Sequence, residues 1–330
     1  MSLQAVSNMR SLYVDVAALL TDGLTPPEPD ILPFGDAFQL FYSGEFNLIF
    51  GDTESGKTWL CLAAVAATLG VGGNAAIIDL DHNGASSTVG RLLESGVSES
   101  ILTDMKRFRL TEPGDRVDLQ AVVQDLTRFE PDVVILDSLG EVLPLFRFNS
   151  NSADDFTIVH ADVIKPLTQR GAAVLVVDHL AKNSDSRAHG PTGTIAKTRA
   201  VGGVAVRVTA EKQFRPGEGG SATLELWKDR HGGVRKNLPP GQKPLIGTFE
   251  LHPGDKSSLN YRFRPNLTTH SVRPDDVHSE QLARDVTILR KYYGSSRPTV
   301  RQAREMLRCS NSRALRVVKS YDVLEVEVPS

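Results

Sequence analysis

The sequence predicts an α/β protein with a parallel central β-sheet, an antiparallel extension of that sheet and a small C-terminal domain. Over the first half of the chain, wholly apolar strands alternate with helical segments, which is typical of a parallel sheet covered on both faces. Strands separated by tight turns follow, as in an antiparallel sheet. The last segment has a basic charge pattern of its own, which marks it as a separate unit.

The first half of the chain supplies the predicted parallel sheet. Apolar runs predict buried strands at 46–50, 75–79, 132–137 and 172–179, and a short strand at 108–110. Helices are expected at 59–69, 85–95, 115–129 and 152–169. Asp115 is a favourable N-cap for the third of them. Before the sheet, we expect a short helix at 14–20 and a strand at 38–42 that pairs with the first core strand.

The chain changes character after Leu180. The segment 182–199 is basic and glycine-rich without periodicity, so a loop is expected. The antiparallel strands are predicted at 203–213, 223–227, 248–251 and 259–263. Prolines before residue 30 favour an extended arm, because each fixes its backbone and restricts its predecessor. The predicted boundaries are an N-terminal arm at 1–29, a core at 30–264, a linker at 265–277 and a C-terminal domain at 278–330.

The composition is that of an ordinary globular protein, with 40% hydrophobic and 23% charged residues. No apolar run is long enough to predict a membrane span, and the first ten residues do not look like a signal segment. Two distant cysteines, Cys61 and Cys309, form neither a disulfide framework nor a zinc motif. We therefore expect a cytoplasmic protein with no membrane partner.

The net charge of −3 is unevenly distributed. Residues 281–320 hold ten Lys or Arg against two acidic residues, a net charge of +8, so the remainder of the chain carries −11. A basic unit on an acidic body favours a polyanionic partner for that unit. A set of solvated helix faces is the alternative interpretation of the same charges.

A phosphate-binding loop connects the first core strand to its helix. The segment from Gly51 to Thr58, Gly-Asp-Thr-Glu-Ser-Gly-Lys-Thr, fits the Gly-x4-Gly-Lys-Ser/Thr pattern at every specified position. Backbone N–H groups and the helix dipole then face the phosphates of a nucleotide. Lys57 is expected to reach the β- and γ-phosphates and Thr58 to bind Mg²⁺. The predicted nucleotide contacts are Gly51, Asp52, Thr53, Glu54, Ser55, Gly56, Lys57, Thr58 and Trp59.

Polar residues follow the other core strands, at the edge of the sheet where ligands bind in such folds. Asp137 fits the carboxylate that orders the Mg²⁺ shell, and a strand-end cap is the alternative. Asp81 is the predicted group that activates water, with Asp79 as its competitor, because residue spacing cannot separate the two. His82 is a third and weaker candidate. His179 is predicted to sense the γ-phosphate, and a purely structural histidine is the alternative.

These segments together resemble the ring-forming RecA-like P-loop ATPases. The resemblance rests on the loop at 42–59, Ile77-Ile-Asp-Leu-Asp81, Val133-Val-Ile-Leu-Asp-Ser138, Val176-Val-Asp-His-Leu-Ala-Lys182 and Lys228-Asp-Arg230, and it covers about residues 30–264. The chain is most similar to the DnaB-like and plasmid RepA-like hexameric helicases and to phage and actinobacterial "AAA family ATPase" proteins. Asp81 stands where that family usually has a glutamate base, so its side chain is one methylene shorter.

The resemblance implies further roles. Lys228 and Arg230 match cations that reach the active site of a neighbouring subunit, which implies a homo-oligomer, most simply a hexameric ring. The loops at 143–152 and 182–199 would face its channel. There Phe146 or Phe148 would stack on bases of single-stranded DNA. The residues expected to contact the DNA backbone are Arg147, Lys182, Arg187, Lys197 and Arg199. A disordered surface loop without DNA contact is the alternative.

The C-terminal residues resemble a winged helix-turn-helix domain. A capped helix is expected from Arg297 to Leu307 with Pro298 near its start, followed by a turn, a second helix at 312–321 and a strand at 323–328. Arg313, Arg316 and Lys319 would lie on the outer face of the recognition helix and bind duplex DNA. A protein-docking module is the alternative.

The sequence thus favours an ATPase that uses ATP and Mg²⁺, forms a ring and drives DNA movement, as a helicase or translocase in phage- or plasmid-type replication or recombination. The alternative is an ATP-switched DNA-binding regulator or loader that does not unwind DNA. An ATPase that assists a nuclease ranks third, because no independent carboxylate cluster supports it.

Overall fold

The computed structural model describes residues 26–180, 190–215, 217–254, 259–267, 274–294, 296–309 and 311–321, together with positions 14, 16, 17, 20 and 24. For residues 274–280, 311 and 312 it describes the backbone alone. Most of the helix expected at 14–20 lies outside these ranges. No helix in the described ranges is both long and apolar enough to cross a membrane.

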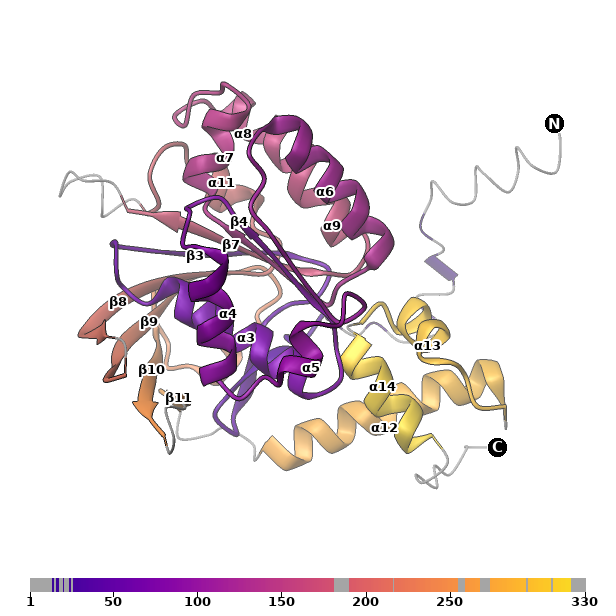
Figure 1. The fold of residues 1–330 in the computed structure, drawn as a ribbon. Coiled ribbons are helices and arrows are strands. Elements are labelled where there is room, and N and C mark those ends of the chain that lie inside the picture. The colour runs from indigo at the N-terminus through magenta and orange to yellow at the C-terminus, as the bar shows by residue number, and fades with distance from the viewer. Residues whose placement is uncertain are drawn as a thin grey trace, which may run out of the picture.

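A nine-stranded sheet forms the centre of the molecule, in the order β11-β10-β9-β8-β3-β7-β6-β4-β5 (Figure 1). The strands from β8 to β5 in this order are parallel, and β9, β10 and β11 continue the sheet in antiparallel fashion. The predicted parallel sheet with its antiparallel extension is therefore confirmed. The strands are β3 (Phe46–Gly51), β4 (Ala75–Asp79), β5 (Phe108–Thr111), β6 (Val133–Asp137), β7 (Ala173–His179), β8 (Val204–Arg215), β9 (Gly219–Asp229), β10 (Leu245–Pro253) and β11 (Leu259–Pro265).

The strand expected at 38–42 does not join this sheet. β2 (Phe38–Phe41) pairs instead with β1 (Ile31–Phe34) in a separate two-stranded sheet. The prediction that it pairs with the first core strand is wrong, because both edges of β3 are already occupied. β7 covers one edge of β3 and β8 covers the other.

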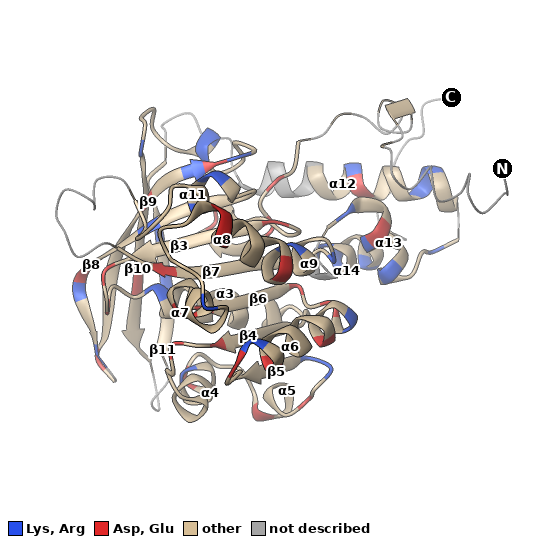
Figure 2. Cartoon of the chain, turned by 90° about the horizontal axis from the view of Figure 1, so that it is seen from above, with Lys and Arg blue, Asp and Glu red and all other residues tan. Residues whose placement is uncertain are grey.

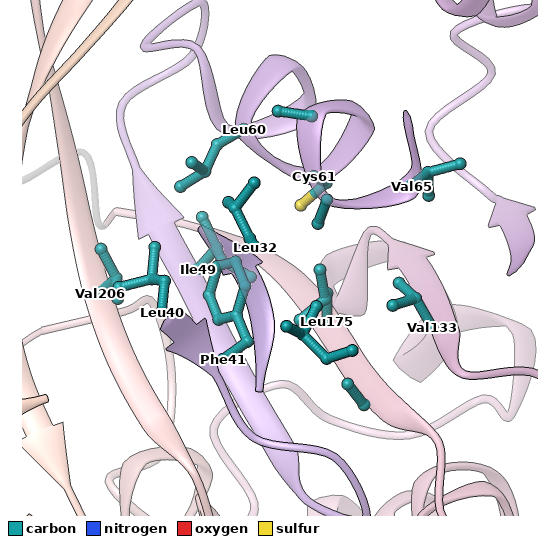
Figure 3. Packing of buried hydrophobic residues seen from close by; sticks show 14 of the residues in the cluster. Leu32, Leu40, Phe41, Ile49, Leu60, Cys61, Val65, Val133, Leu175 and Val206 are labelled. Atoms are coloured by element: carbon teal, nitrogen blue, oxygen red, sulfur yellow. The ribbon is translucent and has the colours of Figure 1, made fainter. Parts of the chain in front are cut away.

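Alternate residues of the parallel strands pack into two separate cores. Ile49, Ile77 and Leu175 face the core that contains the β1–β2 hairpin and helix α3 (Figure 3). Their neighbours Leu48 and Ile78 face the opposite core. This alternation places helices on both faces, since side chains along a strand point to opposite sides. The helices are α3 (Lys57–Gly70), α4 (Ala85–Glu94), α5 (Glu99–Leu102), α6 (Arg116–Phe129), α7 (Leu139–Leu145), α8 (Ala153–Val159), α9 (Lys165–Thr168) and α11 (Ala196–Ala200).

Two helical regions differ from the expectation. The helix expected at 152–169 consists of α8, a π-helical turn at His160–Ile164 and α9. Helix α7 occupies the start of the segment at 143–152 that was expected to be a loop. Asp115 caps α6 as predicted, with its Oδ1 accepting a hydrogen bond from the backbone N–H of Asp118 at 2.9 Å.

The C-terminal residues form three helices with a small core of their own. They are α12 (Pro274–Tyr293), α13 (Val300–Leu307) and α14 (Asn311–Ser320). The two predicted helices are present, and a capping box at Thr299 and Gln302 begins the first. α12 was not predicted as a helix, and it begins inside the expected linker. The expected strand at 323–328 lies outside the described residues, so the winged form of this domain stays a prediction.

The C-terminal helices contact the core at the loops that precede three parallel strands. Arg304 donates from Nη1 to the carbonyl oxygen of Glu130 at 3.3 Å and from Nη2 to the carbonyl oxygen of Arg170. Leu315 lies against Gly72, just before β4. These loops mark the N-terminal edge of the parallel strands, so α13 and α14 lie opposite the edge at which the phosphate-binding loop begins.

Candidate nucleotide site

The phosphate-binding loop connects Gly51, the last residue of β3, to Lys57, the first residue of α3, and glycine is required at both of its ends. A Cβ atom at Gly51 would lie 2.2 Å from the carbonyl oxygen of Val208 on β8. Gly56 has a φ of +95°, in the left-handed region that favours glycine. A Cβ atom there would lie 2.3 Å from the ring of Phe214. The loop is therefore packed tightly against the end of β8.

Lys57 and Thr58 open α3 at the inner side of this loop. The Lys57 ammonium donates to the carbonyl oxygens of Gly51 at 3.2 Å and Asp52 at 2.6 Å. Burial holds the pKa of Lys57 below its usual value, while the nearby carboxylates of Asp137 and Asp81 oppose that shift. The Ser55 hydroxyl oxygen is buried in the same loop without a hydrogen-bond partner among the described atoms. A phosphate bound in the loop fits these groups, because it offers oxygen atoms to an ammonium and a hydroxyl.

Asp137 ends β6 within contact of the loop. Its Oδ2 accepts a hydrogen bond from the Thr58 hydroxyl at 2.8 Å. Asn83 Nδ2 approaches the same oxygen at 3.4 Å. Burial raises the pKa of Asp137 to about 6. A hydroxyl and a carboxylate this close are oxygen ligands of the kind that Mg²⁺ prefers, so the two predicted metal residues lie together.

The two competing carboxylates lie in different environments. Asp79 is buried, and its oxygens accept hydrogen bonds from Asn83 Nδ2 at 3.0 Å and the backbone N–H of Gly84 at 3.2 Å. Asp81 lines the cavity beside the loop, where its carboxylate accepts a hydrogen bond from the Ser138 hydroxyl at 3.2 Å. Asp79 therefore shapes the turn after β4, and Asp81 is the carboxylate that faces the cavity.

His179 ends β7 and completes the group. Its Nε2 lies 3.5 Å from Asp81 Oδ2. The hydrogen bond from His179 holds the pKa of Asp81 below its usual value, with a smaller contribution in the same direction from Ser138. His82, the weaker candidate, is exposed and has a φ of +55°. It does not line the cavity.

The cavity has a volume of about 330 Å³, and some of the residues that line it were not predicted from the sequence. Arg91 on α4 stacks over the Trp59 ring, with its guanidinium carbon 4.9 Å from the ring centroid. From β8, Gln213 donates to Glu54 at 3.1 Å and Phe214 covers Gly56. Only pairing and packing between distant segments place these side chains here, and the sequence carried no local signal for them.

The Lys-Asp-Arg segment lies at the other end of β3. The backbone N–H of Arg230 donates to the carbonyl oxygen of Gly203 at 3.1 Å, whereas Gly51 pairs with Val208. The distance along the strand from Gly203 to Val208 is about 17 Å, which exceeds the length of an arginine side chain. Arg230 is exposed and cannot reach the phosphate-binding loop of its own chain.

Lys228 is bound within its own chain. Its ammonium donates to the carbonyl oxygens of Thr198 at 2.9 Å and Arg199 at 2.8 Å, at the end of α11. Burial lowers the pKa of Lys228, and Arg230 lowers it further. In this conformation the Lys228 ammonium is bound within its own chain, whereas the Arg230 side chain is exposed.

The residues predicted to contact single-stranded DNA are only partly in suitable positions. Arg147 and Arg199 are exposed. Lys197 is buried in a 2.8 Å ion pair with Asp178, so the prediction that it follows a phosphate backbone is wrong. Phe146 is also buried, under the guanidinium of Arg116, and it is not available for base stacking. Lys182 and Arg187 lie outside the described residues.

The three cations predicted for the C-terminal recognition helix also differ. Arg316 and Lys319 are exposed on α14. Arg313 instead points inward, with Nε and Nη2 both 2.9 Å from the carboxylate oxygens of Asp285 on α12. Its predicted place on the outer face is wrong, because α12 covers that side of the helix. Figure 2 shows further cations along α12 and α13.

Comparison with known proteins agrees with this geometry. Residues 22–185 match a family model described as an AAA domain. The chain is 29% identical over 112 residues to the RecA protein of Synechocystis sp., covering 34% of this chain and 29% of that protein. It is 30% identical over 102 residues to the RecA protein of Thermotoga petrophila, covering 31% and 26%. These matches support a RecA-like P-loop ATPase domain in this chain.

The chain matches these RecA proteins over less than a third of their length. The crystal structure of the RadB recombinase is also similar, with a TM-score of 0.46 and 17% identity over 67% of this chain and 91% of that chain. The matched residues include the phosphate-binding loop, Asp81, Asp137 and His179. Arg230 and the C-terminal helices lie beyond them.

Proposed function

We propose that this chain hydrolyses ATP with Mg²⁺, and that Arg230 of a neighbouring copy completes the site. The observation that carries the proposal is the convergence of Lys57, Thr58, Asp137 and Asp81 on one cavity at the phosphate-binding loop. Mg-ATP, when bound, supplies the phosphoanhydride bond and a divalent charge. Thr58 and Asp137 would hold the metal ion.

The remaining side chains act on the phosphates and on water. Lys57 neutralises negative charge on the β- and γ-phosphates while the γ-phosphoryl group is transferred to water. Asp81 orients the attacking water and accepts its proton, while Ser138 and His179 fix the direction of the Asp81 carboxylate. The hydrogen bond from His179 lowers the pKa of Asp81, so the carboxylate stays ionised at neutral pH. His179 also faces the γ-phosphate position and connects it to the segment that follows β7.

The oligomer follows from the position of Arg230. The phosphate-binding loop and Arg230 lie at opposite ends of β3, so a contact that joins them uses two different surfaces of the chain. Interfaces of that kind repeat head to tail and close into rings or extend into filaments. We propose a ring, and by resemblance a hexamer, in which each Arg230 stabilises charge in the next site.

For the biological task we propose a DNA motor, a helicase or translocase of the DnaB-like or RepA-like kind. The exposed Arg147 and Arg199 support contact with single-stranded DNA, and the exposed Arg316 and Lys319 support contact with a duplex. The second candidate is a DNA-binding regulator or loader switched by ATP. The location of the basic C-terminal helices, at the edge of the sheet away from the nucleotide, favours this alternative.

The first test is the substitution Lys57→Ala. We expect ATP hydrolysis to fall by about 100-fold or more, because the charge on the transferred phosphate loses its main cation. ATP binding, measured by titration calorimetry, should weaken in parallel. Lys106→Ala, at an exposed lysine of the same domain, is the matched control and should leave both unchanged. Hydrolysis at the normal rate by the Lys57 variant would refute the site.

A strand-displacement assay separates the two biological roles. With forked DNA and ATP, a motor displaces the annealed strand and the Lys57→Ala variant does not. A regulator or loader binds the same DNA in an ATP-dependent manner without displacing a strand. Binding at several salt concentrations, with Arg316→Ala and Lys319→Ala as variants, measures the electrostatic part of the duplex contact.

A further inference from the structure

We propose that Asp229 is the positioning residue for Arg230. Its carboxylate folds the segment from Arg230 to Arg235 into one shape, and that shape presents the Arg230 guanidinium to a neighbouring chain. This inference rests on the proposed function, in which Arg230 serves the site of the next subunit. It assigns a task to the middle residue of the Lys-Asp-Arg segment, which the sequence analysis left without one.

The Asp229 carboxylate accepts four hydrogen bonds. Oδ1 accepts from the Tyr42 hydroxyl at 2.9 Å and from the backbone N–H of Gly232 at 2.9 Å. Oδ2 accepts from the backbone N–H groups of Val234 at 3.0 Å and Arg235 at 2.8 Å. An ionised carboxylate only accepts hydrogen bonds, so both of its oxygens suit this set of donors. An asparagine at this position would direct its NH2 group, which is itself a donor, toward two of these donors. It would therefore lose half of the four hydrogen bonds.

Tyr42 is the side-chain donor to the Asp229 carboxylate. It is buried, and its hydroxyl also accepts a hydrogen bond from the backbone N–H of Gly233 at 2.8 Å. Burial and the Asp229 charge raise the pKa of Tyr42, so the hydroxyl stays protonated and donates to Asp229. A Cβ atom at Gly233 would lie 2.8 Å from that hydroxyl and 2.6 Å from Pro29, so glycine is required at this point of the loop.

Asn47 ties the same corner to the core sheet. Its side chain accepts hydrogen bonds from the backbone N–H groups of Tyr42 at 3.2 Å and Val204 at 3.3 Å, and it donates to the carbonyl oxygen of Tyr42 at 3.0 Å. Val204 pairs with Asp229 across β8 and β9. The segment that carries Arg230 is thereby fixed to β3, whose other end carries the phosphate-binding loop.

The two cations of the segment have separate tasks in this arrangement. Lys228 holds the end of α11, and α11 is itself held by the buried pair of Lys197 and Asp178. His231 on the other side contacts Glu45, with Nε2 3.2 Å from Oε1. Between them, Arg230 is bound to the fold through its backbone N–H and its side chain is exposed. The geometry therefore directs one guanidinium outward from a rigid base.

The experiment compares Asp229→Asn, Arg230→Ala and the double variant in the full-length chain. We expect Asp229→Asn to lower kcat for ATP at least tenfold and to leave KM within twofold, because its own nucleotide cavity lies at the far end of β3. In the double variant kcat should be no lower than in Arg230→Ala alone, since both substitutions remove the same contribution, that of the Arg230 guanidinium. Asp36→Asn, at an exposed aspartate in the β1–β2 turn, is the matched control and should behave as the unsubstituted protein.

Mixing of subunits distinguishes positioning from simple damage. An Asp229→Asn subunit keeps an intact cavity, and a Lys57→Ala subunit keeps an intact Arg230. Mixed oligomers of the two should regain activity that neither has alone. A fold defect confined to the Asp229→Asn subunit would leave its own cavity impaired, and no activity would return, which would overturn the proposal.

Hydrogen exchange supplies a readout that is independent of activity. The amides of Gly232, Val234 and Arg235 donate to Asp229, so their exchange should accelerate in Asp229→Asn and stay unchanged in the control. If Arg230→Ala is inactive while Asp229→Asn keeps normal kcat and exchange, the positioning role is refuted and the proposed function stands. If Arg230→Ala hydrolyses ATP at the normal rate, the shared site of the proposed function fails, and the positioning role fails with it.

Discussion

Asn47 shows how a single buried amide organises a strand that is otherwise apolar. It lies inside β3 with no exposed surface, between residues that form the two hydrophobic cores. Its amide bonds to the backbone of Tyr42, Glu45 and Val204. A buried amide is tolerated when its donors and acceptors are satisfied, and here they connect the turn before β3 to the start of β8, which is distant in sequence.

We predict that Asn47→Leu lowers the free energy of unfolding by roughly 2–4 kcal/mol. The leucine matches the volume of the amide, but it leaves buried backbone N–H groups of Tyr42 and Val204 without acceptors, and each such group costs about 1–3 kcal/mol. Urea unfolding followed by circular dichroism measures the change. Asn151→Leu, at an exposed position before α8, is the control. A loss below about 1 kcal/mol would mean that the backbone finds other partners.

Single residues also show what the sequence can and cannot predict. The phosphate-binding loop, Asp137, Asp81 and His179 were predictable, because each depends on a local motif or on the end of a predicted strand. Arg91 and Phe214 enter the cavity through packing between distant segments, which leaves no local pattern. Lys197 was misjudged because a lysine in a basic, glycine-rich segment is normally solvated. Its buried partner Asp178 became visible only in three dimensions.

At the scale of elements, the C-terminal helices are joined by an ion pair between Arg313 and Asp285, although the sequence predicted Arg313 on the outer face. Helical spacing on α14 gives Arg313 the same outward direction as Arg316, unless another helix covers it. α12 supplies that cover, and Asp285 on α12 binds both Arg313 nitrogen atoms. The side chains are 17% and 6% exposed, so the pair is largely removed from water. α12 was not predicted as a helix, because its first turn was assigned to the linker at 265–277.

We predict that Asp285→Ala destabilises the three-helix unit by about 3–5 kcal/mol, because it leaves Arg313 buried and unpaired. The rate at which the Cys309 thiol reacts with iodoacetamide measures the change. Burial raises the pKa of this thiol to about 12, and at pH 8 it should react slowly with iodoacetamide. In Asp285→Ala the reaction of Cys309 should be at least tenfold faster, while Cys61 in the main core stays protected. Arg316→Ala on the same helix should change neither rate, and equal rates in Asp285→Ala would refute the prediction.

At the scale of the whole molecule, the two edges of the parallel strands have different tasks. The nucleotide cavity lies where β3, β6 and β7 end. The three-helix unit contacts the loops before β4, β6 and β7, and Arg230 projects near the start of β8. Communication between nucleotide and C-terminal unit within one chain must therefore cross the length of the sheet, whereas a head-to-tail neighbour can bring opposite edges together.

Arg304 is the principal polar link between the two parts among the described contacts. Its guanidinium bonds to carbonyl oxygens at the ends of α6 and α9 and lies 3.7 Å from the Glu130 carboxylate. Gly171 leaves room for it, since a Cβ atom there would lie 3.1 Å from Nη2. The last carbonyl groups of a helix have no intrahelical donor and accept hydrogen bonds readily from a cation. This single side chain therefore joins two helix C-termini to α13.

We predict that Arg304→Ala separates the unfolding of the C-terminal unit from that of the core. Calorimetry should then show two transitions, with the one assigned to α12–α14 at a lower temperature than in the unsubstituted chain. The affinity for Mg-ATP should stay within twofold, because the contact lies at the far edge of the sheet from the cavity. Arg301→Ala is the matched control, since that exposed residue on the same helix pairs only with Glu305 among the described ion pairs, and such pairs contribute about 0.3–0.5 kcal/mol. A variant that unfolds like the control would show that apolar contacts such as Leu315 against Gly72 hold the two parts together without the arginine.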